Sequence, residues 1–202
     1  MKFITLTIGP LSNNCYILSG DEKNAVIIDP AGNYPKITET LTGAGFSPSY
    51  VLLSHGHFDH IGAVKQLQDV GAEVWLHPND RDKITSFRRT TPFVPDKNLV
   101  DGQILNLAGL EIKVIHTPGH TSGGICFHIN NMLFSGDTLF HGNFGRTDLP
   151  SGNFEQLKRS VKEKLFTLPP ETIVYPGHGG SPPGEEETTI GEERLNNSIL
   201  RL

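Results

Sequence analysis

Histidine and aspartate crowd into one short stretch of this chain, "HGHFDH", which contributes His55, His57, Asp59 and His60. Imidazole and carboxylate groups hold zinc, iron and other divalent transition metals in proteins. His55 and His57 are two residues apart, which places both side chains on one side of an extended segment, so they can share one cation. Asp59 and His60 follow as the chain turns and would point elsewhere. The spacing therefore predicts a site for two metal ions.

Three other segments run from an apolar strand into a histidine or aspartate beside a glycine. They are "VIHTPGH", "MLFSGD" and "VYPGH", which end in His120, Asp137 and His178. Rigid strands tend to carry reactive groups at their ends, so these residues can complete two sets of metal ligands. None of the segments contains cysteine, which argues against a closed, cysteine-rich structural zinc site. An open, catalytic site is the better interpretation.

The remaining histidines and one further aspartate are given structural interpretations. We expect surface or hydrogen-bonded roles for four of the nine histidines, His77, His116, His128 and His141. Asp29 in "IIDPAG" also ends a strand. With no histidine near it in the sequence, Asp29 is interpreted as a turn-forming Asp-Pro residue.

Short β-rich runs separated by turn residues open the chain and predict an antiparallel meander. Periodicity then predicts a helix ending near Gly43, a strand before the histidines, a helix after them and another strand. The predicted first-half strands are 3–8, 15–18, 25–28, 50–54 and 72–77, with helices over 36–42 and 61–70. The second half adds strands at 110–117, 123–129, 131–138 and 172–179 and a helix over 154–165. Two β-rich halves suggest packed sheets with helices outside.

Size, charge and cysteine content bound the possible functions. The 202 residues show no shift in composition and predict one domain spanning 1–202. A net charge of −5 argues against nucleic acid as a partner. No apolar run is long enough for a membrane helix, and Gly9 and Pro10 interrupt the start, so neither a membrane partner nor a signal peptide is expected. Cys15 and Cys126 do not suggest a disulfide framework, which fits the cytoplasm. Oligomeric state is left open.

Together the motifs resemble the metallo-β-lactamase superfamily, whose HxHxDH signature is matched by His55 to His60. The resemblance continues through "TPGHTSGG", "FSGDTLF" and "YPGHG" over almost the whole chain. It implies an α/β fold of the αββα sandwich type, with two mixed sheets packed face to face, helices outside and metals between the sheet edges. It also implies two divalent metal ions, zinc in the first instance and iron or manganese otherwise. Their ligands would be His55, His57 and His120 for one ion and Asp59, His60 and His178 for the other, with Asp137 bridging.

The resemblance also implies an activity. Asp137 occupies the position of a cysteine in the best-known zinc β-lactamases, which argues against antibiotic hydrolysis. The stretch "GDTLFHGNFGRTDLPSGN" is similar to small, single-domain glyoxalase II-like hydrolases of bacteria. These relatives imply hydrolysis of small-molecule thioesters of the S-D-lactoylglutathione type by a hydroxide shared between the metals, with Asp59 orienting it. A thiolate leaving group, whose conjugate acid has a pKa of about 8.5, needs no separate general acid.

Substrate recognition is less defined by the sequence. Classical glyoxalase II has a C-terminal helical domain that helps bind glutathione, whereas only about twenty residues follow "YPGHG" in this sequence. Arg146 supplies a positive charge that could meet a substrate carboxylate. The polar stretch 78–98 is interpreted as a loop or lid, and its basic residues from Arg81 to Arg89 either steer an anionic substrate or form a plain solvated loop.

Two alternatives accompany the hydrolase interpretation. Persulfide dioxygenases share this fold and a similar "GRTD" stretch, but use one iron held by two histidines and a carboxylate. The "LPSGN" that follows "GRTD" favours the hydrolases. A metal-binding or regulatory module without turnover ranks lower, because no residue of the expected ligand set is missing.

Overall fold

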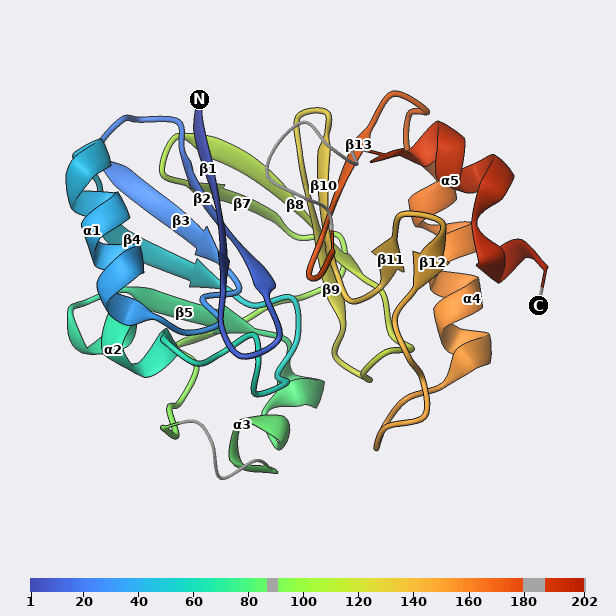
Figure 1. Ribbon diagram of the computed structural model, residues 1–202, viewed down its shortest axis with the longest axis horizontal. Helices are drawn as coiled ribbons and strands as arrows, with labels where there is room; N and C mark the ends of the chain where they lie inside the picture. The colour runs from blue at the N-terminus through green and yellow to red at the C-terminus, as the bar shows by residue number, and fades with distance from the viewer. Residues whose placement is uncertain (87–90, 180–187, 202) are drawn as a thin grey trace.

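Two six-stranded sheets lie face to face in the middle of the molecule (Figure 1). The structure is a computed structural model that describes residues 1–86, 91–179 and 188–201, so Arg88 and Arg89 of the predicted basic loop lie outside the described residues. The first sheet contains, in spatial order, β1 (Lys2–Ile8), β2 (Asn13–Ser19), β3 (Asn24–Ile28), β4 (Ser47–Leu52), β5 (Glu73–Leu76) and β6 (Lys97–Asn98). The second contains β14 (Thr188–Thr189), β13 (Ile173–Pro176), β10 (Met132–Gly136), β9 (Ile125–Ile129), β8 (Leu110–His116) and β7 (Ile104–Leu107).

Both sheets are mixed. In the first, β1, β2 and β3 are antiparallel, as the predicted meander requires, and β3 to β6 are parallel. In the second, β7 to β10 are antiparallel and β13 is parallel to β10. A small hairpin of β11 (Leu139–Phe140) and β12 (Asn143–Phe144) follows β10. The parallel strands matter for function, because their carboxyl ends open at one edge of each sheet.

Helices cover the outer face of each sheet, α1 (Tyr34–Ala44) and α2 (Val64–Asp69) on one side, α4 (Phe154–Glu163) and α5 (Ile190–Asn196) on the other (Figure 1). Short helical turns stand between these elements, η1 (Pro78–Asp80), α3 (Lys83–Ser86) and η2 (Leu165–Thr167), and η3 (Ser198–Leu200) follows α5. The expected αββα sandwich is therefore confirmed. No helix in the described ranges is long and apolar enough to cross a membrane.

Period-two alternation in the central strands produces the layers. In β2, Cys15 and Ile17 pack toward α1 and α2, whereas Tyr16 and Leu18 pack into the core between the two sheets. Successive strand residues point to opposite faces, so a strand covered on both sides is buried along its whole length. A third cluster, which includes Leu157 and Val161 of α4, fills the space between the second sheet and its helices.

Several helices and strands begin or end a few residues away from their predicted boundaries. Helix α1 continues to Ala44 because Gly45, rather than Gly43, takes the left-handed conformation (φ 76°) that ends it. Strand β4 ends at Leu52, two residues before its predicted end, and α4 ends at Glu163 and is followed by η2. Strand β7, which was not predicted, pairs with β8 at the edge of the second sheet.

Candidate metal centre

The structure brings all seven predicted metal ligands to one edge of the sandwich. The loop after β4 carries His55, His57, Asp59 and His60, and His120, Asp137 and His178 follow β8, β10 and β13. Ligand atoms gather into a three-histidine group of His55, His57 and His120 and an Asp59 group of Asp59, His60 and His178, each with its atoms within 4.8 Å of one another. Both groups draw on both sheets, which explains how distant segments of the chain form one centre.

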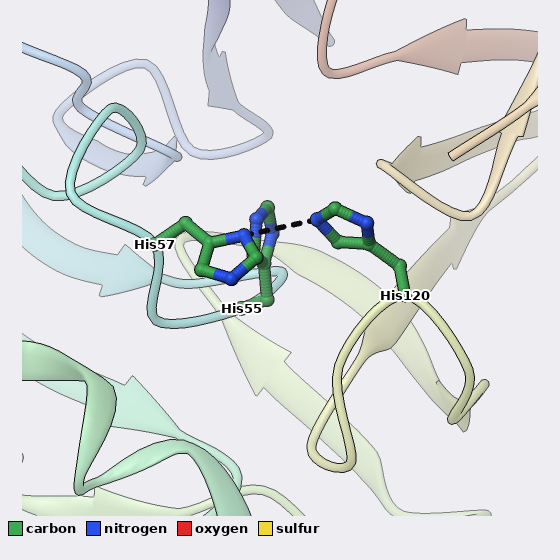
Figure 2. A group of neighbouring side chains, drawn as sticks. All are labelled: His55, His57 and His120. Carbon is green, nitrogen blue, oxygen red and sulfur yellow. Dashed lines mark hydrogen bonds between the residues drawn. The ribbon is translucent and has the colours of Figure 1, made fainter. Parts of the chain in front are cut away.

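The three-histidine group converges from two loops. The rings of His55 and His57 face that of His120, and the Nδ1 of His57 lies 3.0 Å from the Nε2 of His120 (Figure 2). Burial, followed by the neighbouring histidines, lowers the pKa of His55 well below its ordinary value. Burial and His120 also lower the pKa of His57 to about 4. Both rings are therefore neutral at pH 7, the form that binds metals.

In the Asp59 group, a carboxylate lies against two histidine rings. His178 Nε2 lies 3.2 Å from Asp59 Oδ2 and 3.3 Å from His60 Nε2. Burial opposes ionisation of Asp59, but the hydrogen bond from His178 and the charge of His60 hold its pKa at about 2. Burial also acts against protonation of His178, yet hydrogen bonds to Asp137 and Asp59 raise its pKa to about 9. A cation would compete with these protons for the same nitrogen and oxygen atoms.

Asp137 stands between the two groups. Its Oδ1 lies 3.4 Å from His60 Nε2, and its Oδ2 lies 3.6 Å from His120 Nε2. Gly177 packs so closely here that a Cβ would fall 2.3 Å from Asp137 Oδ1. This position requires glycine because the carboxylate occupies the space that a side chain would need.

In His55, His120 and His178, the Nδ1 atom contacts an oxygen outside the centre, and the Nε2 atom points to the centre. The Nδ1 of His120 donates to the Arg146 carbonyl at 2.7 Å, and that of His178 donates to the Leu11 carbonyl at 3.3 Å. His55 Nδ1 lies 3.0 Å from Ser54 Oγ. Histidines that bind metals usually donate their other ring nitrogen in this way, which fixes the tautomer.

The predicted reading of Asp29 as a simple turn residue is wrong. Asp29 is buried, takes a left-handed conformation (φ 50°) and places Oδ2 2.9 Å from His60 Nδ1. Its two oxygens also accept from the backbone N–H of Ser54 at 2.8 Å and from the Ser54 hydroxyl at 2.5 Å. Its oxygens are engaged by these donors, so it acts as an orienting partner of the histidines. Its histidine lies far along the chain, but its place at a strand end matched that of the other site residues and could have flagged it.

The residues present fit divalent metal ions. The Nε2 of His55 is buried without a hydrogen-bond partner among the described residues, although it points into a cluster of ligand atoms. A buried polar atom left unpaired is costly, and a cation would satisfy it. Two groups of three ligands also leave coordination positions open, as catalytic sites require.

A cavity of about 460 Å³ opens over the metal centre. Leu11, Phe58, Phe140 and Leu149 give it apolar walls. Arg146, predicted to bind substrate, also lines it, but its guanidinium is held by Asp148 through two hydrogen bonds of 2.7 Å. The positive charge of Arg146 is therefore already paired with Asp148, a contact that was not predicted.

The four histidines given structural interpretations belong to neither ligand group. His77 and His116 stack on each other with ring centroids 4.2 Å apart, and His116 Nε2 bonds the Ser122 carbonyl at 3.0 Å. His128 lies within β9, and His141 lies in the turn of the β11–β12 hairpin. His77, His116 and the exposed His141 agree with the interpretation from the sequence, whereas the Nε2 of His128 is buried without a hydrogen-bond partner among the described residues.

The family model of the metallo-beta-lactamase superfamily matches residues 8–178. The chain belongs to that superfamily. Among its curated members, "Hydroxyacylglutathione hydrolase GloC" of Haemophilus influenzae is 36% identical over 99% of this chain and 98% of its own length. This similarity spans the strand ends that carry the ligands, so the whole centre lies within the matched region.

Solved structures of the superfamily carry several different names. "BLEG-1 B3 metallo-beta-lactamase" has a TM-score of 0.88 and 36% identity, covering 98% of this chain and 99% of that one. TTHA1623 "in a di-iron-bound form" has a TM-score of 0.83 and 35% identity, covering 97% and 99%. ETHE1 from Myxococcus xanthus has a TM-score of 0.82 and 30% identity, covering 98% and 84%. The metallo-beta-lactamase fold is thus shared by proteins that carry different names.

Proposed function

We propose that the chain is a binuclear metallohydrolase that cleaves small-molecule thioesters of the S-D-lactoylglutathione type. The position of Asp137 carries the two-metal part of the proposal, because its two oxygens face a histidine of each ligand group, at 3.4 and 3.6 Å. The name of the GloC relative supports the thioester. Zinc is the proposed metal, and the di-iron form of TTHA1623 makes iron the alternative.

Two divalent cations would supply a hydroxide at neutral pH and polarise the thioester carbonyl. His55, His57 and His120 would hold one ion, His60 and His178 the other, while Asp59 would bind and orient. The apolar walls of the cavity would receive the acyl and thiol arms and limit access of bulk water. No separate acid is needed for the departing thiolate, whose conjugate acid has a pKa of about 8.5.

Arg146 and Asp148 bear on which thiol the cavity accepts. A carboxylate on the thiol arm could reach the guanidinium only by displacing Asp148. We therefore expect Asp148→Asn to lower KM for S-D-lactoylglutathione several-fold and Arg146→Gln to raise it, because exposed ion pairs are worth little and exchange readily. A neutral thioester serves as the control, and its KM should not follow the same order.

A single-iron persulfide dioxygenase is the second candidate, because the three-histidine group with Asp137 could hold one iron and the fold is shared with ETHE1. That function would leave unexplained why Asp59, His60 and His178 form a second, separately oriented group. A metal-binding module without turnover stands lower still. The free, buried state of Cys15 and Cys126 fits the proposed cytoplasmic location.

The deciding experiment combines metal content with three assays on one preparation. About two metals per chain and hydrolysis of S-D-lactoylglutathione that is abolished in Asp59→Ala would support the proposal. One iron per chain, with oxygen uptake on glutathione persulfide and no thioester hydrolysis, would replace it with the dioxygenase. Cleavage of a β-lactam in preference to the thioester would align the chain with BLEG-1 instead.

A further inference from the structure

Asp80 belongs to neither ligand group, yet it is fully buried and surrounded by donors. It ends η1, the turn that follows β5. Its Oδ2 accepts from the backbone N–H of Gly56 at 3.0 Å and from the Thr121 hydroxyl at 2.8 Å. Its Oδ1 accepts from the backbone N–H of Gly123 at 2.8 Å and lies 3.2 Å from Lys83 Nζ. Burying a carboxylate without partners would be very costly, and these four contacts offset that cost for Asp80.

Three of the four donors, Gly56, Thr121 and Gly123, belong to the two loops that carry the three-histidine group, and the fourth, Lys83, belongs to α3. Gly56 stands between His55 and His57, and Thr121 directly follows His120. One loop leaves the first sheet and the other leaves the second, and the rings meet in the gap between them (Figure 2). Through its two oxygens, Asp80 therefore joins the two sides of this group.

The contacts leave little room for the two loops to move apart or together. A Cβ on Gly56 would lie 2.6 Å from the Asp80 carbonyl oxygen, and one on Gly123 would lie 2.6 Å from Asp80 Oδ1. Both glycines are thus required by the close approach of Asp80. Asn79 adds to the connection, since its carbonyl accepts from the Ser122 hydroxyl at 3.2 Å.

The Asp59 group is held by a different element. Asn13 in β2 donates through Nδ2 to Asp59 Oδ2 at 3.0 Å. Its neighbour Asn14 donates from the backbone to the Gly177 carbonyl at 2.8 Å and from Nδ2 to the Gly179 carbonyl at 2.9 Å, on either side of His178. Asp80 and the Asn13–Asn14 pair therefore support different groups, so loss of the Asp80 contacts need not disturb the Asp59 group.

We propose that Asp80 is a positioning residue that sets the spacing between His55, His57 and His120 and thereby the affinity of that group for its metal. The proposal rests on the two-metal site described under Proposed function, but not on the substrate. Loss of a partner that orients metal ligands typically lowers metal affinity 10- to 100-fold. Asp80→Asn, which turns one oxygen into a donor facing other donors, should therefore weaken one of two zinc sites by about that factor.

The test uses Zn²⁺ alone, titrated against a competing chelator, with no substrate present. Asp82→Asn is the matched control, because it makes the same chemical change on a side chain 78% exposed and 3.4 Å from the same Lys83. Wild type and the control should bind both zinc ions equally, and Asp80→Asn should show one site weakened. Thermal unfolding of the zinc-free chains checks that the variants fold, and Thr121→Val, which removes only one link, replaces Asp80→Asn if that variant does not.

Two backgrounds identify which site has changed. In His178→Ala, which disables the Asp59 group, Asp80→Asn should weaken the remaining zinc 10- to 100-fold; in His120→Ala it should have no effect, because coupled residues are non-additive. Unchanged zinc affinity, or the same loss in both backgrounds, overturns the proposal. The outcome is separable from the proposed activity: a wild type that binds two zinc ions without hydrolysing any thioester refutes the thioesterase and leaves the role of Asp80 to be decided by the titration.

Discussion

Replacing Asp29 by asparagine should disturb both ligand groups at once. The Ser54 hydroxyl donates to Asp29 Oδ2 at 2.5 Å, so the Nδ1–H of His55 donates to Ser54 Oγ at 3.0 Å. His60 donates its own Nδ1–H to the same Oδ2 at 2.9 Å. One carboxylate oxygen therefore keeps the Nε2 lone pairs of two histidines directed at the centre.

In Asp29→Asn, an NH₂ group in place of Oδ2 donates where it formerly accepted. The Ser54 hydroxyl then turns its proton toward His55 Nδ1, and His60 Nδ1 must accept, so the ring proton of each histidine moves to Nε2. A protonated Nε2 cannot bind a metal. The opposite amide orientation is also unfavourable, because it places the NH₂ group of the variant side chain against the backbone N–H of Ser54, which donates to Asp29 Oδ1 in the wild type.

The expected magnitude follows from these bonds. Each metal should bind 10- to 100-fold more weakly, since one orienting bond is altered in each group. That loss corresponds to roughly 1.4–2.7 kcal/mol for each metal, at about 1.4 kcal/mol per tenfold. The zinc-free chain should lose about 1.5–3 kcal/mol of stability, the usual contribution of a hydrogen bond to a charged group.

Zinc affinity by chelator competition and thermal unfolding of the zinc-free chain measure the two effects. Asp21→Asn is the control, because Asp21 also accepts several hydrogen bonds but is exposed in the β2–β3 turn. Full affinity for both zinc ions in Asp29→Asn would refute the tautomer argument. Weakening of only the ion held by the Asp59 group would show that Ser54 does not relay the change to His55.

Three further predictions address the packing around the centre. Gly177→Ala places a Cβ 2.3 Å from Asp137 Oδ1, so it should displace that carboxylate and lower zinc content and activity together, which metal analysis and kinetics will show. Cys15 and Cys126 are completely buried, and burial raises the pKa of both thiols, that of Cys126 to about 11. Neither thiol should therefore react with iodoacetamide at pH 8 until the chain is unfolded, which mass spectrometry can follow. Rapid modification of the native chain would contradict this expectation. Leu157→Ala removes a fully buried side chain and should cost about 2–5 kcal/mol in denaturant unfolding, and a loss under about 1 kcal/mol would mean that α4 is not well packed.

The candidate ligands that the sequence could bring together are those whose signal is local. His55, His57, Asp59 and His60 lie within one turn, and the other ligands stand at strand ends beside glycine, so spacing and strand pattern were enough to collect them. The two-layer sheet arrangement followed from the same strand periodicity. The family resemblance then supplied the pairing of ligands into two groups, and two of the three candidate clusters in the described residues have these members, while the third joins Asp29 to His55 and His60.

The residues missed are those that act through distant partners. Asp29 lies 31 positions from His60 and Asp80 lies 41 from Thr121, so no short window of sequence contains both members of either contact. Arg146 was assigned an available positive charge because its pairing with Asp148 depends on how the loop turns. Side-chain partners of this kind are fixed by the folded backbone and not by the spacing of a motif.

The division of the chain between the sheets determines when the metal centre can form during synthesis. All strands of the first sheet precede those of the second, and both ligand groups need residues from each half. His178 follows His60 by 118 positions, an interval of roughly 6–24 s at the usual synthesis rate of about 5–20 residues per second. Until then the histidine-rich turn leaves the ribosome as an incomplete set of ligands. Completion of the Asp59 group is therefore tied to synthesis of nearly the whole chain, and a chain truncated before β13 would keep the three-histidine group but lack His178.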